Sequence, residues 1–316
     1  MMMNFGKVGV IYGGFSSERE ISLISGKTIY NALLEAGIDV HLFDLGRNTL
    51  MLLSESKFDR VFIALHGRFG EDGTIQGVLE LLGIPYTGSG QLSSGIAMNK
   101  VLSKQIWLQE YLPTPEFEYL RDINSLTIAA NKLGFPLIIK PVHEGSTVGI
   151  RKVDFFESKS IEDAYYNALD FDNEVFAEKF ISGRELTVSI LGSRNSTKVL
   201  PVVEIIVPNG NYDYDHKYFA DETKYICPAI LPKHITDLII DISIKAYNSI
   251  GCDSWARVDF ILDNDNNPWL LEINTSPGMT DHSLVPIAAK VAGISYTDLC
   301  LYILSEASCK IISRIF

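Results

Sequence analysis

Hydrophobic and polar residues alternate on both sides of a cluster of Asn, Asp and Pro near the end of this chain. Alternation with a period of two, interrupted by turn-forming residues, predicts a β-hairpin over residues 257–274. If the turn is centred on Asp265 and Asn266, Asp259 lies directly opposite Glu272. Facing Cβ atoms in such a pair are roughly 4.5–5.5 Å apart. The pattern therefore brings two carboxylates close together on one face of the hairpin.

The same register places Arg257 opposite Asn274 on that face, because side chains on a strand repeat with a period of two. Two carboxylates this close repel each other, and a divalent cation relieves the repulsion. Mg²⁺ prefers a few carboxylate oxygens together with substrate phosphates. The arrangement therefore predicts a metal site that needs a phosphate-bearing partner. The alternative is a surface hairpin whose acidic residues face water.

Segments with strand and helix patterns alternate along the rest of the chain, which predicts an α/β fold. The expected strands cover residues 7–12, 40–44, 61–65, 137–140, 175–180 and 186–191. The expected helices cover residues 22–36, 93–110, 123–133 and 233–250. Residues 208–228 are polar, rich in tyrosine and without periodicity, which is typical of a functional lid or of a disordered segment.

Composition and charge narrow the class of protein. The chain has 316 residues, of which 47% are hydrophobic and 21% charged, as in an ordinary soluble enzyme. A net charge of -12 argues against nucleic acid as a partner, which requires a basic surface. The four cysteines are scattered without a C-x-x-C pair, which favours reduced thiols in a cytoplasm. No segment approaches about 18 uninterrupted apolar residues, so we expect no membrane span.

Two polar loops follow strands at the end where open α/β sheets bind ligands. Glu18 lies between the first loop and a helix, where its carboxylate is expected to bind an ammonium or to interact with the helix N-terminus. His66 begins the second loop, which is rich in glycine, and is either a site residue or a buried structural histidine. The first loop lacks the third glycine of a G-x-G-x-x-G fingerprint, which argues against a nicotinamide cofactor.

The middle of the chain carries further candidates for phosphate binding. Lys140 ends an apolar strand and is expected to face an anion or solvent. Residues 143–149 are rich in small and hydroxylated side chains and are expected to fold backbone N–H groups over phosphates, or to form a plain hairpin loop. Glu185 follows a turn, at a position where it could accept hydrogen bonds from ribose hydroxyls.

Several motifs taken together make the chain resemble a known family. They are Glu18, the segment HGRFGEDGT from His66, the segment EGSTVG from Glu144, the pair Lys217-Tyr218 and the segment LLEINTSPGMTDHS from Leu270. The order and spacing of these motifs resemble those of D-alanine–D-alanine ligases of the ATP-grasp superfamily. The resemblance covers nearly the whole chain. The resemblance implies three α/β domains at residues 1–92, 93–182 and 183–316, with ATP bound between the central and C-terminal domains.

The resemblance also implies roles in binding ATP. The residues expected to contact its phosphates are Lys100, Lys140 and Lys217. The residues expected to frame adenine and ribose are Glu178, Lys179, Ile181 and Glu185. The loop expected to cover the triphosphate contains Glu144, Gly145, Ser146 and Thr147. The residues expected to hold two Mg²⁺ or Mn²⁺ ions are Asp259, Glu272 and Asn274.

For the substrates, the resemblance implies two molecules of D-alanine. Glu18 is expected to bind the ammonium of the first, and Ser283 with Leu284 the carboxylate of the second. The expected oxyanion donors are Arg257 and the backbone N–H of Gly278. The lid is expected to close through Tyr218, which would bond toward Glu18 and Ser146. The group that deprotonates the second amine is expected to be His66 or a water relay.

The implied reaction joins two molecules of D-alanine through an acyl phosphate, releases ADP and phosphate, and serves peptidoglycan precursor synthesis. The resemblance also implies a homodimer. Tyr218, where a phenylalanine would favour D-lactate, favours an amine as the acceptor. Three alternatives remain: another ATP-grasp ligase, a nucleotide-binding regulatory module without turnover, and a nicotinamide dehydrogenase.

Overall fold

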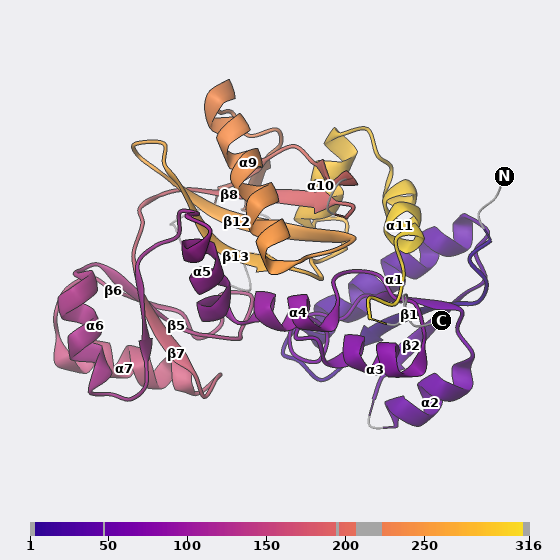
Figure 1. Ribbon diagram of the computed structural model, residues 1–316, viewed down its shortest axis with the longest axis horizontal. Helices are drawn as coiled ribbons and strands as arrows, with labels where there is room; N and C mark the ends of the chain where they lie inside the picture. Colours follow the sequence, from indigo (N-terminus) through magenta and orange to yellow (C-terminus); the bar gives the residue numbers. More distant parts are fainter. Residues whose placement is uncertain (1–3, 47, 194–195, 207–222, 312–316) are drawn as a thin grey trace.

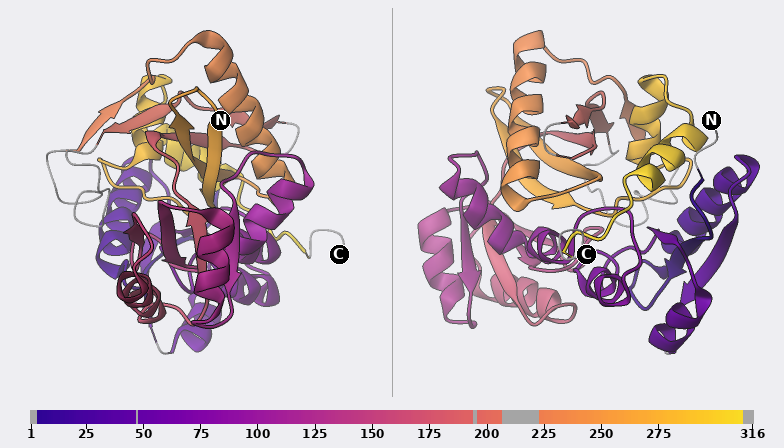
Figure 2. Two further views of the ribbon diagram at one scale, coloured as in Figure 1. Left: turned by 90° about the vertical axis from the view of Figure 1, so that its left-hand side faces the viewer. Right: turned by 45° about the vertical axis from the view of Figure 1, so that its right-hand side comes forward.

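The computed structural model describes residues 4–46, 48–193, 196–206 and 223–311, whose strands form three sheets flanked by helices (Figure 1). We call each sheet with its helices a unit: N-terminal, central and C-terminal. In Figure 1 the central unit lies at the left, the N-terminal unit at the right and the C-terminal unit above both. Figure 2 shows the same separation from two further directions. The mixture of helices and sheets confirms the predicted α/β class.

The N-terminal unit is built on a parallel sheet of order β2-β1-β3. Its strands are β1 (Val8–Gly13), β2 (Val40–Leu45) and β3 (Arg60–Ile63), and its helices are α1 (Arg19–Glu35), α2 (Thr49–Ser56) and α3 (Thr74–Leu82). Because β1 and β3 are parallel neighbours, the polar loops that follow them leave the sheet at the same edge. The loops that carry Glu18 and His66 therefore lie side by side.

The central unit is an antiparallel sheet of order β4-β7-β5-β6. Its elements are β4 (Phe117–Leu120), α6 (Ser125–Leu133), β5 (Leu137–Pro141), β6 (Arg151–Val153), α7 (Ser158–Leu169) and β7 (Val175–Lys179). Both helices contribute to one buried apolar cluster with the strands, for example through Ala129 of α6 and Ala168 of α7. This cluster is separate from the clusters of the other two units.

The C-terminal unit contains the largest sheet, of order β11-β10-β8-β12-β13 with β9 paired to β8. Its strands are β8 (Gly183–Leu191), β9 (Lys198–Val199), β10 (Val203–Ile206), β11 (Lys224–Ile226), β12 (Trp255–Asp263) and β13 (Pro268–Asn274). Its helices are α9 (Lys233–Ile250), α10 (Leu284–Val291) and α11 (Tyr296–Ser305), of which α9 lies along the sheet (Figure 1).

The hairpin of β12 and β13 has the register that the alternating pattern predicts. Asp259 pairs with Glu272 and Arg257 with Asn274. The register shifts directly after Asp259, so that Phe260 pairs with Leu270. Such a bulge re-aims neighbouring side chains and is common beside functional sites.

Two helices that follow the N-terminal unit connect it to the central unit. They are α4 (Gln91–Met98) and α5 (Lys100–Gln109). The sequence predicts one helix over residues 93–110, and this prediction is wrong at Asn99, where the backbone is extended. The Asn99 side chain accepts a hydrogen bond from Leu102 N at 2.9 Å and so caps α5.

Trp107 of α5 is buried in the core of the C-terminal unit, although the family resemblance implies that residue 107 belongs to the central domain. The boundaries of the three domains remain predictions.

The N-terminal and C-terminal units share one apolar core. Ile29 and Leu33 of α1 are buried in the same cluster as Ala288 of α10 and Ile303 of α11. Figure 1 shows α11 beside α1 accordingly. This shared core holds the start of α1, where Glu18 lies, in a fixed position relative to α10.

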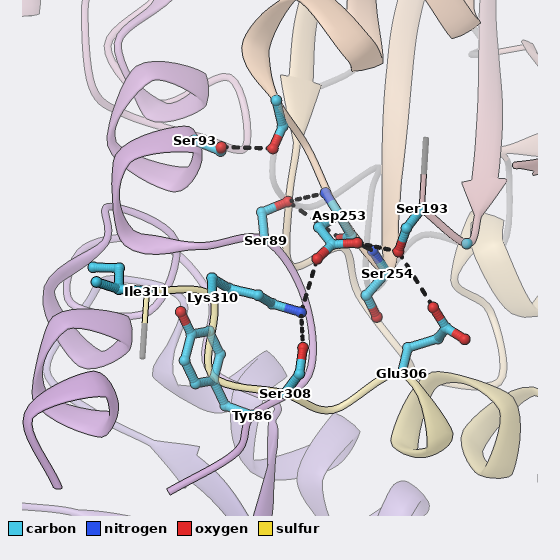
Figure 3. Close-up of polar contacts among 12 residues, drawn as sticks. Tyr86, Ser89, Ser93, Ser193, Asp253, Ser254, Glu306, Ser308, Lys310 and Ile311 are labelled. Carbon is cyan, nitrogen blue, oxygen red and sulfur yellow. Dashed lines mark hydrogen bonds and ion pairs between the residues drawn. The ribbon is translucent and has the colours of Figure 1, made fainter. Parts of the chain in front are cut away.

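The chain after α11 crosses back to the N-terminal unit and forms what we call the C-terminal clasp, Ser308 to Lys310 (Figure 3). Ser308 and Tyr86 exchange backbone hydrogen bonds of 3.1 and 3.4 Å. Lys310 N donates to Glu80 Oε1 at 2.5 Å, and Lys310 Nζ lies 2.9 Å from Asp253 Oδ2 in the C-terminal unit. The clasp therefore contacts both units with one short segment.

Of residues 208–228, predicted to be irregular, the structure describes 223–228, which include a strand that the sequence does not predict. Residues 224–226 form β11, which pairs with β10. Lys217 and Tyr218 lie outside the described residues. Among the described residues no single helix is long and apolar enough to cross a membrane, and only α10 taken together with α11, across a 107° bend, has the required length and composition.

Candidate active site

One cleft runs between the three units, and the β12–β13 hairpin forms one of its walls. Arg257, Asp259, Glu272 and Asn274 all line this cleft. Arg257 Nε lies 2.9 Å from Asp259 Oδ1 and Arg257 Nη2 lies 2.7 Å from Asp259 Oδ2. Thr187 Oγ1 donates to Asp259 Oδ1 at 2.5 Å. The predicted acidic face is therefore turned into a cleft and not to open solvent.

The hairpin wall has the chemistry of a site for a hard divalent cation. The facing carboxylates of Asp259 and Glu272 line the cleft together with the side-chain amide of Asn274. Their oxygen atoms are ligands of the kind that Mg²⁺ prefers. Among the described residues no group of three or more His, Cys, Asp or Glu side chains is arranged to hold a metal ion. The residues fit a cation that completes its coordination with water and ligand phosphates.

Two lysines face this wall from the helix and the sheet across the cleft. Lys100 Nζ lies 3.2 Å from Glu272 Oε2 and donates to the backbone oxygen of Glu144 at 2.6 Å. Lys140 also lines the cleft, and its ammonium donates to Glu178. Positive charge thus stands opposite the carboxylates, as expected of a site for a polyphosphate bound with a cation.

Glu178 lies behind Lys140 and is held by a second lysine, which the sequence analysis missed. Lys104 Nζ lies 2.8 Å from Glu178 Oε2 and donates to Thr114 Oγ1 at 2.6 Å. Burial alone would raise the pKa of Glu178, but Lys104 and Lys140 outweigh burial and hold that pKa below its usual value. Burial lowers the pKa of Lys104 to about 8, against the opposing effect of Glu178.

The loop of residues 143–149 crosses the cleft toward the N-terminal unit. Ser146 and Thr147 both have left-handed backbone angles, with φ of 50° and 64°. Such angles cost of order 1–3 kcal/mol for a non-glycine residue and cluster at functional sites. The Ser146 hydroxyl donates to the Glu18 carboxylate. The loop is therefore held in an unfavourable conformation that places it over the cleft.

Glu18 is buried at the start of α1 and lines the cleft. Gly67 lies so close that a Cβ there would be 2.9 Å from Glu18 Oε2, and its φ is +67°. Glycine is therefore the residue that this position accepts without strain. The Glu18 carboxylate faces the cleft beside Ser146 and Glu71, which makes it suitable for a small cationic group.

His66 does not line the cleft but lies behind its wall. Its side chain is 4% exposed, with Nδ1 2.9 Å from Ser276 O and Nε2 3.0 Å from Ser25 Oγ. Burial alone would lower the pKa of His66, but Glu71, with Glu18 and the Ser276 carbonyl, holds that pKa above its usual value. With both ring nitrogens bonded, His66 fixes the turn that contains Ser276.

Glu71 is a cleft residue that the sequence analysis did not single out. Its side chain is 12% exposed and its Oε1 lies 3.8 Å from His66 Nδ1. Burial and the charge of Glu18 raise the pKa of Glu71, against the opposing effect of His66. The only signal in the sequence was its place in the glycine-rich loop after β3.

The turn after β13 and the start of α10 complete the cleft. Gly278, Ser283 and Leu284 line it. Ser283 Oγ accepts a hydrogen bond from Thr280 N at 2.9 Å, and a Cβ on Gly278 would lie 2.8 Å from that Oγ. Gly278 therefore allows the turn to pack closely against the N-terminus of α10, a position that favours anions.

Most residues predicted for the site line the cleft together. They are Glu18, Lys100, Lys140, Glu144, Gly145, Ser146, Thr147, Glu185, Arg257, Asp259, Glu272, Asn274, Gly278, Ser283 and Leu284. His66 and Glu178 lie directly behind it, while Lys179 and Ile181 lie at the end of β7 and in the link to β8 and are not among the lining residues. The geometry suits binding of a polyphosphate beside a small zwitterion.

The chain is similar to known proteins over nearly its whole length. A family model described as D-ala D-ala ligase C-terminus matches residues 106–305, and one described as D-ala D-ala ligase N-terminus matches residues 50–89. The D-alanine–D-alanine ligase of Bordetella pertussis is 58% identical over 311 residues, which cover 98% of both chains.

Solved structures are similar over nearly the whole chain. The D-alanine–D-alanine ligase of Bacillus anthracis superposes with a TM-score of 0.83 at 36% identity, covering 95% of this chain and 96% of that one. A structure of the same enzyme complexed with ATP gives a TM-score of 0.82 at 34% identity, with the same coverage. The VanG D-Ala:D-Ser ligase of Enterococcus faecalis gives a TM-score of 0.82 at 29% identity, covering 95% and 98%.

Proposed function

The chain belongs to the D-alanine–D-alanine ligase family, and we propose that the cleft between its units is where it joins two molecules of D-alanine with ATP. The fold is ATP-grasp, and the dipeptide product serves peptidoglycan synthesis. One observation carries the assignment of the site: the Asp259–Glu272 pair and the Glu18–Ser146 pair face the same cleft. A phosphate site and an ammonium site therefore lie within one enclosure.

ATP is bound by the lysines and the loop that cover the cleft. Lys100 and Lys140 contact its phosphates, and the loop of Glu144 to Gly149 covers the triphosphate. Glu178, Lys179, Ile181 and Glu185 frame adenine and ribose. Asp259, Glu272 and Asn274 would hold two Mg²⁺ or Mn²⁺ ions, which would neutralise charge on the phosphates. Lys217 and Tyr218 lie outside the described residues, and their proposed roles are to contact the γ-phosphate and to close the lid.

The first D-alanine is bound by Glu18, whose carboxylate accepts hydrogen bonds from the substrate ammonium. The substrate carboxylate oxygen attacks the γ-phosphorus, the bond to the β-phosphate oxygen breaks, and ADP is formed as the leaving group beneath the closed loop. Such a transfer depends on positioning and on neutralisation of charge more than on covalent help from the protein. Lys100 and Lys140 supply fixed positive charge, and the closed loop keeps water away from the acyl phosphate.

The second D-alanine is bound with its carboxylate at Ser283 and the N-terminus of α10. Its amine, after losing a proton, attacks the acyl carbon, and the tetrahedral intermediate carries an oxyanion. Arg257 and the Gly278 N–H stabilise that oxyanion; loss of one such donor typically costs about 10²–10³ in rate. The intermediate collapses with release of phosphate. His66, with both nitrogens bonded, positions the Ser276–Gly278 turn in this scheme, and the proton leaves through a water relay.

The acceptor substrate is the point on which related ligases differ, since one similar structure is that of a D-Ala:D-Ser ligase. We propose D-alanine, in keeping with the greater identity to a D-alanine–D-alanine ligase. Tyr218 favours an amine over D-lactate and does not distinguish D-alanine from D-serine. A homodimer in the cytoplasm completes the proposal, on the habit of the family and on the scattered cysteines.

The test is a coupled assay of ADP release against a panel of D- and L-amino acids and D-hydroxy acids, with the products identified by mass spectrometry. We expect D-alanine alone to support release of ADP with equal formation of D-alanyl-D-alanine. Efficient turnover only when D-serine or D-lactate is added would contradict the proposed acceptor. If none of these substrates supported ADP release, the assignment of the cleft to a ligase would be contradicted.

A further inference from the structure

Arg68 lies in the loop after β3 and extends from the N-terminal unit to the central unit. The next residue, Phe69, has a left-handed backbone with φ of 67°, and its N–H donates to Asp72 Oδ2 at 2.9 Å. The Phe69 ring packs edge-on against Phe15 with ring centroids 5.9 Å apart. These contacts fix the turn, so the direction in which Arg68 leaves it is set by the N-terminal unit.

The Arg68 guanidinium contacts two carboxylates of the central unit through different nitrogen atoms. Nε donates to Glu144 Oε1 at 2.8 Å, and Nη2 lies 3.1 Å from Asp172 Oδ1. Glu144 begins the loop that covers the cleft, while Asp172 lies between α7 and β7. A planar guanidinium with several fixed donors is suited to such a bridge, and a lysine ammonium is not.

Hydrogen bonds from His143 hold the Asp172 carboxylate in position for this bridge. Its Oδ2 accepts hydrogen bonds from His143 N at 2.8 Å and lies 2.9 Å from His143 Nδ1. Its side chain is 5% exposed. Burial opposes ionisation, yet the bonds from His143 hold the pKa of Asp172 well below its usual range. The second oxygen of an ionised, fixed carboxylate is therefore presented to Arg68.

Glu144 connects the bridge to the chemistry of the cleft. Its backbone oxygen accepts from Lys100 Nζ at 2.6 Å, and the same ammonium lies 3.2 Å from Glu272 Oε2. Two and three residues further along, Ser146 and Thr147 have the left-handed angles described above, which persist only where other contacts support them. The loop is thus tied to the N-terminal unit at two points, Glu144 to Arg68 and Ser146 to Glu18.

We propose that Arg68 is a positioning residue that holds the loop of Glu144 to Gly149 closed over bound nucleotide and so controls the rate at which ADP leaves. This inference rests on the proposed function of the cleft. Arg68 itself is 42% exposed, which keeps the ion pairs weak enough to open in each cycle. Arg68 does not line the cleft, so it acts through Glu144 and not on the substrates.

The test measures dissociation of ADP from the full chain in the presence of Mg²⁺, by stopped-flow displacement of a fluorescent ADP analogue. Arg68→Met keeps an apolar stem and removes both ion pairs, and we expect ADP to dissociate about 5–30-fold faster. Arg68→Lys keeps the charge but cannot bridge both carboxylates, and an intermediate rate is expected. Lys132→Met is the matched control, because it removes an ion pair of the central unit, with Glu118, away from the loop.

Two further readouts separate positioning from general stability. KM for ATP is expected to rise in Arg68→Met while KM for D-alanine changes less than about 2-fold. Hydrogen exchange at backbone amides of residues 143–150 is expected to slow on ADP binding in the wild type and to slow much less in Arg68→Met. Arg68→Met and Asp172→Asn are expected to be non-additive, because they remove the same contact.

Unchanged ADP dissociation and loop exchange in Arg68→Met would overturn this inference alone and leave an ordinary surface ion pair. Equal effects of Arg68→Met and Lys132→Met would also overturn it, because both would then act through stability. A wild-type chain that binds no ADP would overturn the proposed function of the cleft and this inference with it.

Discussion

Asp259 stands directly opposite Glu272 across the β12–β13 hairpin, and both side chains face the cleft. Arg257 compensates the first carboxylate and Lys100 the second. In the proposed function, the phosphates of the nucleotide bind beside these two negative charges. A cation bound between the carboxylates and the phosphates would relieve the repulsion between these negatively charged groups.

Removing one carboxylate of this pair is expected to weaken cation binding. Glu272→Gln keeps the size of the side chain and should lower affinity for Mn²⁺ in the presence of ADP by at least about 10–100-fold, the usual cost of altering even the outer shell of a metal site. Titration followed by electron paramagnetic resonance measures it without turnover. Asp265→Asn, in the exposed turn of the same hairpin, is the control and should bind Mn²⁺ normally. Equal affinity in wild type and Glu272→Gln would contradict the metal assignment.

Removing the Ser146 hydroxyl is expected to weaken binding of the first substrate. Ser146 donates to Glu18, and a hydrogen bond to a charged group contributes about 1.5–3 kcal/mol. Ser146→Ala should therefore raise KM for the first D-alanine by about 10-fold or more in steady-state kinetics. Ser93→Ala, which removes a hydroxyl bonded to Gly251 O outside the cleft, should leave KM unchanged. An unaltered KM in Ser146→Ala would show that the contact does not position Glu18.

Because the pKa of Lys104 is lowered in the folded chain, the free energy of unfolding is expected to rise with pH. Burial lowers the pKa of Lys104 to about 8 in the folded chain, below its ordinary value of 10.5, so the unfolded chain binds more protons between these two pH values. Lys104 therefore adds stability as pH rises through this window and loses that contribution as pH falls to about 8. The difference in unfolding free energy between wild type and Lys104→Met should grow by up to ~1.4 kcal/mol per pH unit. A difference independent of pH from 8 to 10 would contradict the lowered pKa.

The C-terminal clasp is expected to contribute to stability more than to catalysis. Lys310 contacts Asp253 of the C-terminal unit and lies 5.8 Å from the centroid of the Tyr86 ring (Figure 3). Lys310→Met should lower the melting temperature by about 2–4 °C, the shift that corresponds to about 1 kcal/mol in a large domain. Lys290→Met, at an exposed lysine, should not. Because the two units also share an apolar core, we expect kcat within about 2-fold of wild type. A large loss of kcat without loss of stability would assign the clasp a catalytic role instead.

The sequence predicts the local geometry of the cleft better than its long-range contacts. The hairpin register follows from alternation and turn residues within a short segment, which is why the Asp259–Glu272 pair is correct. The bridge from Arg68 to Glu144 and Asp172 joins separate units, and no local pattern indicates it. Lys104 was missed for the same reason, since its partner Glu178 lies on another element.

Two errors in secondary structure have similar causes. Apolar residues keep helical spacing through residues 93–110, so the break at Asn99 is seen only in the folded chain, in its extended backbone and in the capping hydrogen bond from Leu102 N. Residues 224–226 have no strand pattern of their own and become β11 by pairing with β10. In both cases a contact made by the folded chain outweighs the local pattern.

The acyl-phosphate route is tested most directly by following one carboxylate oxygen of D-alanine into inorganic phosphate. When D-alanine labelled with ¹⁸O in both carboxylate oxygens is turned over with unlabelled ATP, the attacking oxygen of the first substrate must leave with the phosphoryl group. We expect inorganic phosphate that carries one ¹⁸O atom for each D-alanyl-D-alanine formed, measured by mass spectrometry. Unlabelled phosphate released together with the dipeptide would contradict an acyl phosphate in this cleft.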